Sequence, residues 1–133
     1  MRYLLDTDTC IWLLRKREPV VSRVIAESPE DLAIASMTLA ELYFGAMNGN
    51  NPDREEQKIE RLIFRISEVI AFDQGAARIH AELRYALRAN KISERDLVIA
   101  SVGVANSLIL VTSNQREFRR VPGLQLEDWM VSQ

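Results

Sequence analysis

Short runs of apolar residues alternate along the chain with longer stretches in which apolar residues recur every three or four positions. The short runs predict β-strands, and the longer amphipathic stretches predict helices. We expect strands at residues 3–5, 32–35, 69–72, 108–111 and near 124–126. Strands that alternate with helices favour a mostly parallel sheet with helices on both faces. The pattern therefore predicts an α/β fold, a three-layer α/β/α sandwich with a central mostly parallel sheet.

Local end signals place the helices between these strands. A first helix is expected from Thr9 to Leu14, and a second at Pro19, because proline is favoured in the first turn of a helix. Thr38 and Ser93 each precede an acidic residue by three positions, which is the capping-box spacing that begins a helix. The other expected helices follow the loop at residues 48–52, run from Ala76 to near Asn90, and surround Glu117.

Length and composition fit one globular domain over residues 1–133. Hydrophobic residues make up 47% of the chain and charged residues 27%, without an internal repeat. The longest apolar stretch, Leu97 to Val111, is too short and too interrupted to span a bilayer. An acid at Asp6 comes too early for a signal peptide. The single cysteine, Cys10, cannot form an internal disulfide, so a cytoplasmic location is expected.

The net charge of −2 does not favour nucleic-acid binding by general electrostatic attraction. Arginine is nevertheless plentiful, and acidic residues gathered around divalent cations would reverse the local charge. Charge alone therefore leaves the class of partner open.

Acidic and amide side chains follow two of the strands and begin two of the helices. Asp6 ends the first strand, and Glu41 and Asp96 lie near helix starts. Functional groups gather beyond the carboxyl ends of parallel strands, so we expect these acids to converge. Converging carboxylates repel unless a proton or cation intervenes, and magnesium prefers oxygen ligands. The sequence predicts a magnesium site with Asp6 and Asp96 as direct ligands. Glu41 would bind the metal or orient the attacking water.

Each acid also has a purely structural interpretation. Glu41 and Asp96 could satisfy the N-terminal amides of their own helices at capping-box spacing. Asp6 could begin an ordinary turn, with Asp8 or Thr9 capping the next helix. The acids taken alone leave both interpretations open.

Four blocks of sequence resemble, in order, the motifs of VapC toxins, which are PIN-domain ribonucleases of bacterial toxin–antitoxin pairs. The blocks are residues 4–8 (Leu-Leu-Asp-Thr-Asp), 38–46, 96–100 and the C-terminal stretch 110–129. Together they cover essentially the full length, and four ordered blocks are far more specific than any one of them. The resemblance implies a PIN-like fold and a metal-dependent endoribonuclease. It also implies Mg²⁺ as the cofactor, with Mn²⁺ as a substitute.

By the same resemblance, three acids take the core positions of the site: Asp6, Glu41 and Asp96. Asp6 and Asp96 are the implied magnesium ligands. The fourth acidic position of many PIN domains falls on Asn114, and Glu117, one helical turn later, could supply the missing charge. Which of these two residues fills the fourth position is left open. Asp8 stands where the family more usually has asparagine, and we expect it to cap the first helix.

The resemblance further implies partners. A cognate VapB-type antitoxin would insert a segment into the active-site groove, and the chain itself would form a homodimer. Family members commonly cut transfer RNA or ribosomal RNA at one site, and we expect transfer RNA here. The sequence names neither the RNA nor the bond that is cut.

Other classes of protein fit less well. A haloacid dehalogenase-type phosphatase also begins with Asp-x-Asp, but it needs a threonine where Cys10 stands and a catalytic lysine for which Lys91 is a poor candidate. A phosphoacceptor receiver module needs a lysine late in the sheet, and Lys91 is the last one. A catalytically silent PIN-fold partner-binding module remains as an alternative, which the intact acids disfavour. His80, the only histidine, has no recognisable acid–base partner.

Overall fold

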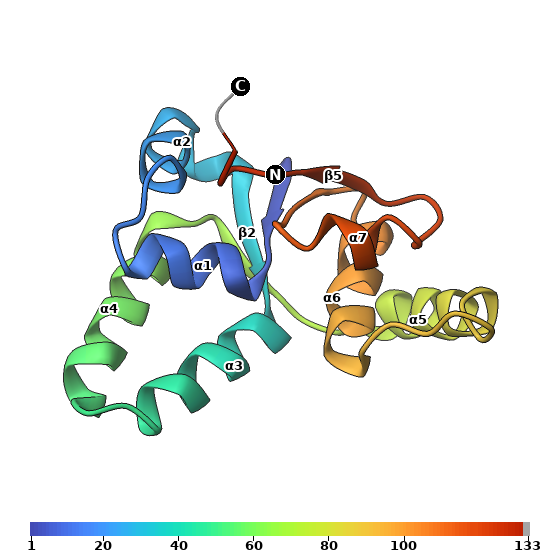
Figure 1. Cartoon of the computed structure of the whole chain (residues 1–133), viewed down its shortest axis with the longest axis horizontal. Helices are drawn as coiled ribbons and strands as arrows, with labels where there is room; N and C mark the ends of the chain where they lie inside the picture. The colour runs from blue at the N-terminus through green and yellow to red at the C-terminus, as the bar shows by residue number, and fades with distance from the viewer. Residues whose placement is uncertain (132–133) are drawn as a thin grey trace.

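The computed structural model describes residues 1–131, which form an α/β/α sandwich around a five-stranded parallel sheet (Figure 1). The strands are β1 (Tyr3–Leu5), β2 (Leu32–Ala35), β3 (Glu68–Ile70), β4 (Ile109–Val111) and β5 (Gln125–Glu127). They lie in the order β3-β2-β1-β4-β5, and every neighbouring pair is parallel. The expected fold class is confirmed. Residues 132–133, at the end of the expected domain, lie outside the described residues.

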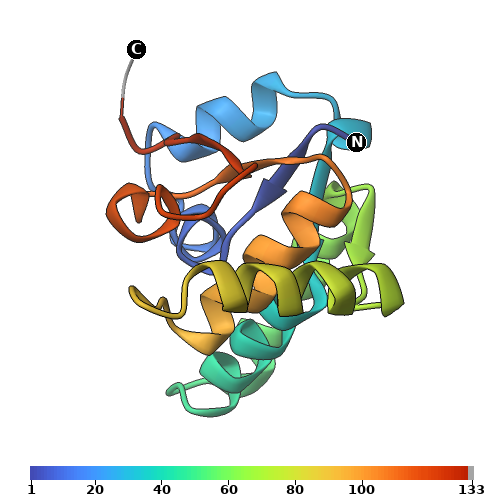
Figure 2. The ribbon, with the colours of Figure 1, turned by 90° about the vertical axis from the view of Figure 1, so that its right-hand side faces the viewer.

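Helices cover both faces of the sheet (Figures 1 and 2). They are α1 (Thr7–Leu14), α2 (Val20–Ala26), the 3-10 turn η1 (Pro29–Asp31), α3 (Ser36–Met47), α4 (Pro52–Arg65), α5 (Gln74–Ala86), α6 (Glu94–Ala105) and α7 (Gln115–Phe118). Helices α1 to α4 pack on one face, and α5 to α7 pack on the other. Helix α5 begins at Gln74, two residues before the expected start, and ends at Ala86, about one turn before the expected end near Asn90. Within residues 1–131, no helix is long and apolar enough to cross a membrane.

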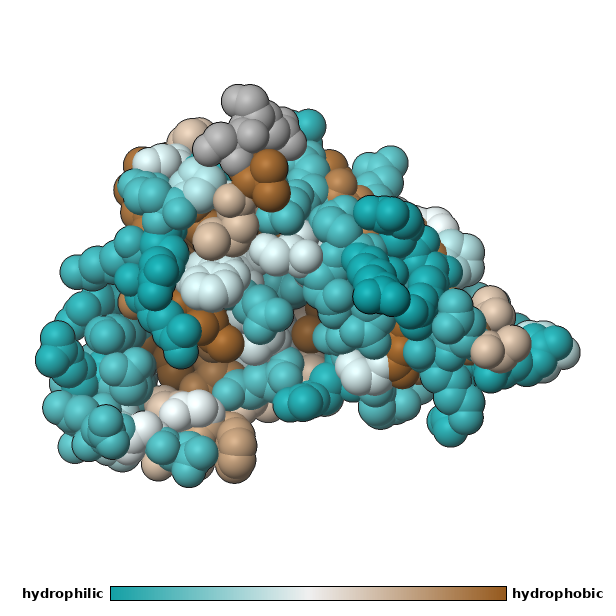
Figure 3. Space-filling view, viewed as in Figure 1, coloured by the Kyte–Doolittle hydropathy of each residue, from teal (hydrophilic) through white to brown (hydrophobic). Residues whose placement is uncertain are grey.

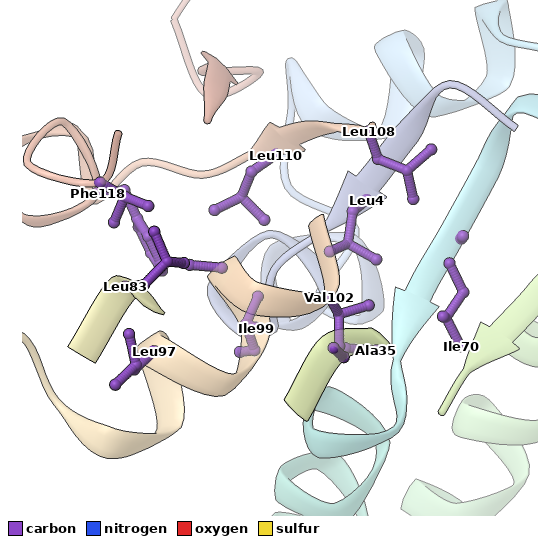
Figure 4. Close-up of a cluster of buried hydrophobic side chains, with 14 of the residues drawn as sticks. Leu4, Ala35, Ile70, Leu83, Leu97, Ile99, Val102, Leu108, Leu110 and Phe118 are labelled. Atoms are coloured by element: carbon purple, nitrogen blue, oxygen red, sulfur yellow. The ribbon is translucent and has the colours of Figure 1, made fainter. Parts of the chain in front are cut away.

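A hydrophobic core lies on each face of the sheet, and the inner strands contribute side chains to both. In β1, Tyr3 and Leu5 pack towards α1 to α4, whereas Leu4 packs towards α5 and α6. Strand β2 repeats this alternation, because successive side chains of a strand point to opposite faces. Strands buried on both faces have almost no polar residues, which explains the uninterrupted apolar runs in the sequence. Figure 4 shows the second core, where Leu110 of β4 and Val102 of α6 lie in the same cluster as Leu4.

The direction of the connections reverses at β1. The chain passes from β1 to β2 and β3, and then returns through α5 and α6 to β4, on the other side of β1. In sheets of this kind a crevice opens where the connections diverge, beyond the carboxyl ends of the strands. Asp6 directly follows β1, and Thr112 directly follows β4. The topology therefore places the expected site at this switch point.

The start of α1 differs from the expectation. The helix begins at Thr7 instead of Thr9, because Asp6 is its N-cap and accepts a hydrogen bond from the Thr9 backbone N–H at 2.8 Å. Asp8 therefore lies within the first turn, and the expectation that Asp8 or Thr9 caps this helix is wrong.

The starts of α3 and α6 resolve the two capping-box interpretations. Helix α3 begins at Ser36, immediately after β2, so Thr38 lies inside the helix and forms no capping box with Glu41. Helix α6 does have the expected cap, since Ser93 Oγ accepts a hydrogen bond from the Asp96 backbone N–H at 3.2 Å.

Candidate active site

A polar hollow of about 190 Å³ lies at the switch point. Its lining comes from four parts of the chain: Asp6, Thr7 and Asp8 after β1, Glu41 of α3, Ser93, Arg95 and Asp96 at the start of α6, and Asn114 and Phe118 after β4. Four of the five expected site residues thus line one hollow, although up to about a hundred positions separate them in sequence. We call it the acidic hollow.

Asp6 is buried at the end of β1, with only 4% of its surface exposed. Burial raises the pKa of Asp6, hydrogen bonds from Thr112 and Thr9 oppose this effect, and the charge of Asp8 raises the pKa further. The charged form of Asp6 is therefore costly in the metal-free protein. A bound cation would remove that cost.

Asp96 and Glu117 form a coupled pair of carboxyl groups. Burial raises the pKa of Asp96 to about 6, and the neighbouring Glu117 raises it as well, against an opposing hydrogen bond from Ser93. Burial also acts to raise the pKa of Glu117, but hydrogen bonds from the Ser93 backbone N–H, from Asn114 and from Asp96, with the charge of Arg120, bring it below its usual range. In the metal-free protein Asp96 is therefore the member of the pair that loses its proton at the higher pH.

Asp96 does not complete the capping box of α6, as it would if its role were purely structural. In a capping box the acid at the third position reaches back to the N–H of the N-cap residue. Here the Ser93 backbone N–H donates instead to Glu117 Oε1, at 2.9 Å. The Asp96 carboxyl is thereby left to face the acidic hollow.

Glu41 is held from two sides. Thr7 Oγ1 donates to Glu41 Oε1 at 2.6 Å, and Thr38 Oγ1 lies 3.2 Å from the same Thr7 hydroxyl. On the other side, Arg95 Nη1 lies 3.1 Å from Glu41 Oε2. This ion pair joins α3 to the start of α6 across the mouth of the acidic hollow. It gives Glu41 one orientation before any substrate binds.

Asn114 and Glu117, offered in the sequence as alternatives for the fourth position, lie together. Asn114 Nδ2 donates to Glu117 Oε2 at 2.8 Å, and the Asn114 backbone N–H donates to Thr112 Oγ1 at 2.9 Å. Asn114 lines the acidic hollow, while Glu117 is connected to it through Asp96. Asn114 and Glu117 therefore form a pair in which the Asn114 amide orients the Glu117 carboxylate.

Comparison with known proteins shows the family to which this chain belongs. The PIN domain family model matches residues 3–124 of the chain. The tRNA(fMet)-specific endonuclease VapC of Salmonella typhimurium is 34% identical over 133 residues, which cover 97% of this chain and 98% of that protein. This chain is a PIN-domain protein of the VapC family. The resemblance in the four sequence blocks is confirmed.

Solved structures agree with this VapC-family assignment. The chain superposes on the DNA-bound VapBC of Salmonella typhimurium with a TM-score of 0.91 and 32% identity, over 97% of this chain and 98% of that one. VapBC2 of Rickettsia felis, bound to a DNA fragment from its promoter, gives a TM-score of 0.86 and 29% identity, over 97% and 99% of the two chains.

The donor set of this VapC-family site suits a hard divalent cation. All the side chains that could bind metal in the acidic hollow offer oxygen, and neither the histidine nor the cysteine is among them. In the part of the chain that the structure describes, no three acidic, histidine or cysteine side chains are gathered closely enough to cage an ion. Magnesium does not require such a cage, because it keeps several waters and uses one or two carboxylates.

Three polar residues of the site were not predicted from the sequence: Thr7, Thr112 and Arg95. Thr112 directly follows β4, and Thr7 is the second residue after β1, so position near a strand end was the available signal. Arg95 gave no signal beyond its place next to Asp96. His80 also differs from the expectation, because its Nε2 lies 2.8 Å from Glu94 Oε1, an acid on the following helix.

Proposed function

We propose that this chain is a magnesium-dependent endoribonuclease and the toxin of a VapBC toxin–antitoxin pair, built as a single PIN domain over residues 1–133. The observation that carries the proposal is the convergence of Asp6, Glu41 and Asp96 on one acidic hollow at the switch point of the sheet. Its relatives are named as ribonucleases.

Asp6 and Asp96 would hold the magnesium ion. When bound, the ion would supply charge neutralisation at the phosphodiester and would make a water molecule more acidic. The raised pKa values of both carboxyl groups support this role, since no positive side chain among residues 1–131 lowers either pKa. Asn114 and Glu117 would position Asp96 through the hydrogen bonds that join the three side chains.

Glu41 would accept a hydrogen bond from the attacking water and orient it towards phosphorus. Its two oxygens already contact Thr7 and Arg95, and both contacts favour the orientation that the carboxylate has in the structure. The water oxygen would form the new bond to phosphorus as the bond to the leaving ribose oxygen breaks. The Glu41 carboxylate would take the proton from the water, and the leaving ribose oxygen would take up a proton from solvent. Fixed orientation of this kind lowers the entropic cost of reaching the transition state.

Transfer RNA is the proposed substrate, because the Salmonella typhimurium relative is named as a tRNA(fMet)-specific endonuclease. Transfer RNA is cytoplasmic, and we propose the same location for this chain. We also propose that the chain forms a homodimer, as the family resemblance implies.

A VapB-type antitoxin is the proposed protein partner, since the structural neighbours are VapBC complexes. A second hollow, of about 460 Å³, lies between α1, α3 and α4 and shares Glu41 with the acidic hollow. Its apolar lining includes Leu14 and Ile59, and its charged lining includes Arg15, Arg54 and Lys58, the last of which pairs with Glu55. Figure 3 shows hydrophobic surface in this region. An antitoxin segment with apolar side chains would fit here and reach the active site.

Sequencing of RNA ends after brief expression of the chain in cells tests this function. We expect new ends at one position of one or a few transfer RNAs. Asp96→Asn is the matched control, because it keeps the size of the side chain and removes its charge. Expression of Asp96→Asn should give no new ends. The absence of new ends from wild type would instead support the catalytically silent partner-binding module, and the same new ends from both proteins would remove Asp96 from the site.

A further inference from the structure

A large aromatic side chain is exposed beside the active site. Phe44 lies on α3, three residues after Glu41, and 69% of its surface is accessible. Residues three apart on a helix share a face, so Phe44 lies on the same face of α3 as Glu41. Its apolar ring makes no contribution to either core. This exposure suggests a ligand.

Phe44 and Arg95 line the same hollow. This third hollow, of about 450 Å³, opens directly outside the acidic hollow. Thr7, Asp8 and Glu41 line both, so the two are continuous. A group that enters the outer hollow therefore lies next to whatever bond is positioned at the carboxylates.

We propose that the outer hollow is a nucleobase subsite in which a base next to the cut phosphodiester stacks on Phe44. Arg95 would provide the opposite wall, since its planar guanidinium can stack on a base or donate to it. The inference rests on the proposed ribonuclease function and adds the residues that bind the flanking nucleotide.

The charge of the site favours a base as the occupant. With Arg95 paired to Glu41, the charge of Asp8 leaves the lining negative and disfavours a phosphate group, whereas the face of a base is uncharged and polarisable. The net charge of −2 also provides little general attraction for RNA. Stacking on aromatic residues supplies affinity that does not depend on net charge. Because every base can stack, the subsite should tolerate any base and reject an abasic ribose.

Steady-state RNA cleavage separates this subsite from the catalytic carboxylates. For Phe44→Ala we expect KM to rise at least about fivefold, with kcat within about twofold of wild type, as for loss of one base stack. Phe44→Trp should keep the wild-type KM. The matched control is Phe64→Ala, because Phe64 of α4 is 91% exposed and does not line the outer hollow. It should behave as wild type.

A binding measurement tests the subsite without turnover. Phe44→Trp combined with Asp96→Asn places a fluorescent reporter in the hollow of a protein that we expect not to cleave. Short single-stranded RNA should quench this fluorescence. An otherwise identical RNA with an abasic ribose at one position should bind at least about fivefold more weakly. Loss of quenching at one abasic position, and at no distant one, supports the subsite.

Protein partners are the competing occupants, and they give different results. Phe44→Ala could leave KM unchanged while it converts a dimer to monomers or weakens antitoxin binding, and either result would overturn the proposal. Equal quenching by intact and abasic RNA would do the same. If wild type cleaves no RNA, the ribonuclease function fails, and the quenching experiment still decides whether bases bind here.

Discussion

Asp6 has two roles that pull in different directions. It caps α1 by accepting the Thr9 N–H, which stabilises the fold, and it is a buried acid whose charge is costly without a cation. An asparagine at this position would keep the cap, because its amide oxygen caps a helix well, but it would carry no charge. The two roles can therefore be separated by substitution.

Asp6→Asn should melt at the same temperature as wild type or higher in EDTA at neutral pH. Asp6→Ala should lose about 1 kcal/mol of unfolding free energy, since the cap is removed. Both variants should lose about 100-fold or more of the cleavage rate, as expected when a metal ligand is removed. Thermal melts in EDTA beside an RNA cleavage assay measure both effects. If Asp6→Asn melts well below wild type, the role of Asp6 is mainly structural.

The coupled Asp96–Glu117 pair predicts how metal-free stability depends on pH. The pKa of Asp96 rises from 3.8 in the unfolded chain to about 6 in the fold, so between these values the folded form binds more protons. This contribution to stability is present at low pH and is lost as pH rises through 6. Asp6 acts in the same direction. The pKa of Glu117 is lowered from its ordinary value of 4.5, so its contribution to stability changes in the opposite direction and only below about pH 4.5.

We therefore expect the melting temperature in EDTA to fall more steeply between pH 4.5 and 6.5 for wild type than for Asp96→Asn, over a range set by these pKa values. Asp96→Asn should be the more stable protein at the upper end of that range. Parallel curves for the two proteins would mean that Asp96 does not hold a proton in the fold.

Glu117 and Asn114 can be ranked by their contacts. Glu117→Gln removes a charge next to Asp96, whereas Asn114→Ala removes one of several donors to Glu117. We expect Glu117→Gln to lower the cleavage rate by about tenfold or more, and Asn114→Ala by less, in the range of residues that support metal ligands. Single-turnover rates at saturating magnesium give the comparison. Equal and small losses would mean that Asp6, Glu41 and Asp96 suffice.

Some of these residues could be predicted and others could not. Asp6 follows a strand and Asp96 lies in the first turn of a helix, and Glu41 lies on the helix that directly follows β2, so the fold class itself directs all three to one edge. The contacts of Arg95 with Glu41 and of Ser93 with Glu117 depend on how α3, α6 and α7 pack, and no local pattern encodes that packing.

Helices α3 and α6 meet at the active site through the Arg95–Glu41 ion pair. Arg95 is mostly exposed, so the pair should add little to stability, in the range of about 0–1 kcal/mol. Its larger effect is electrostatic, because it places a positive charge at the mouth of a hollow that is to receive a cation.

Arg95→Gln should bind magnesium about threefold more tightly than wild type, since one repelling charge near the ion is removed. The melting temperature in EDTA should change little. Calorimetric titration with magnesium measures the affinity, and Arg78→Gln, on the exposed face of α5 and paired with Glu82, is a matched control. Unchanged or weaker magnesium binding in Arg95→Gln would show that Arg95 does not act on the metal site.

The elements themselves were largely predictable, and their ends less so. The inner strands β1, β2 and β4 were found because both of their faces are buried, which leaves apolar runs in the sequence. The starts of α1 and α3 were missed, since each helix begins within a residue of the preceding strand. Asp6 is the single residue between β1 and α1 and caps α1, and Ser36 follows β2 without a loop. Helix–strand junctions this short leave no room for a separate turn signal.

In the whole molecule, one topological feature brings the acids together. The reversal of connections at β1 opens the crevice, and β1, α3, α6 and the segment after β4 each deliver one or more of its polar residues. Neither net charge nor composition predicts RNA as the substrate. The claim rests on this constellation and on membership of the VapC family.

The most direct test is cleavage of purified transfer RNA by purified protein, freed of antitoxin, with and without divalent cations. Wild type should cut at one position in magnesium or manganese, should stop in EDTA, and should not be restored by calcium. Asp96→Asn, which is expected to remain folded, should cut nothing in any of these conditions. Full cleavage by wild type in excess EDTA, or by Asp96→Asn in magnesium, would contradict a metal site built on Asp6 and Asp96.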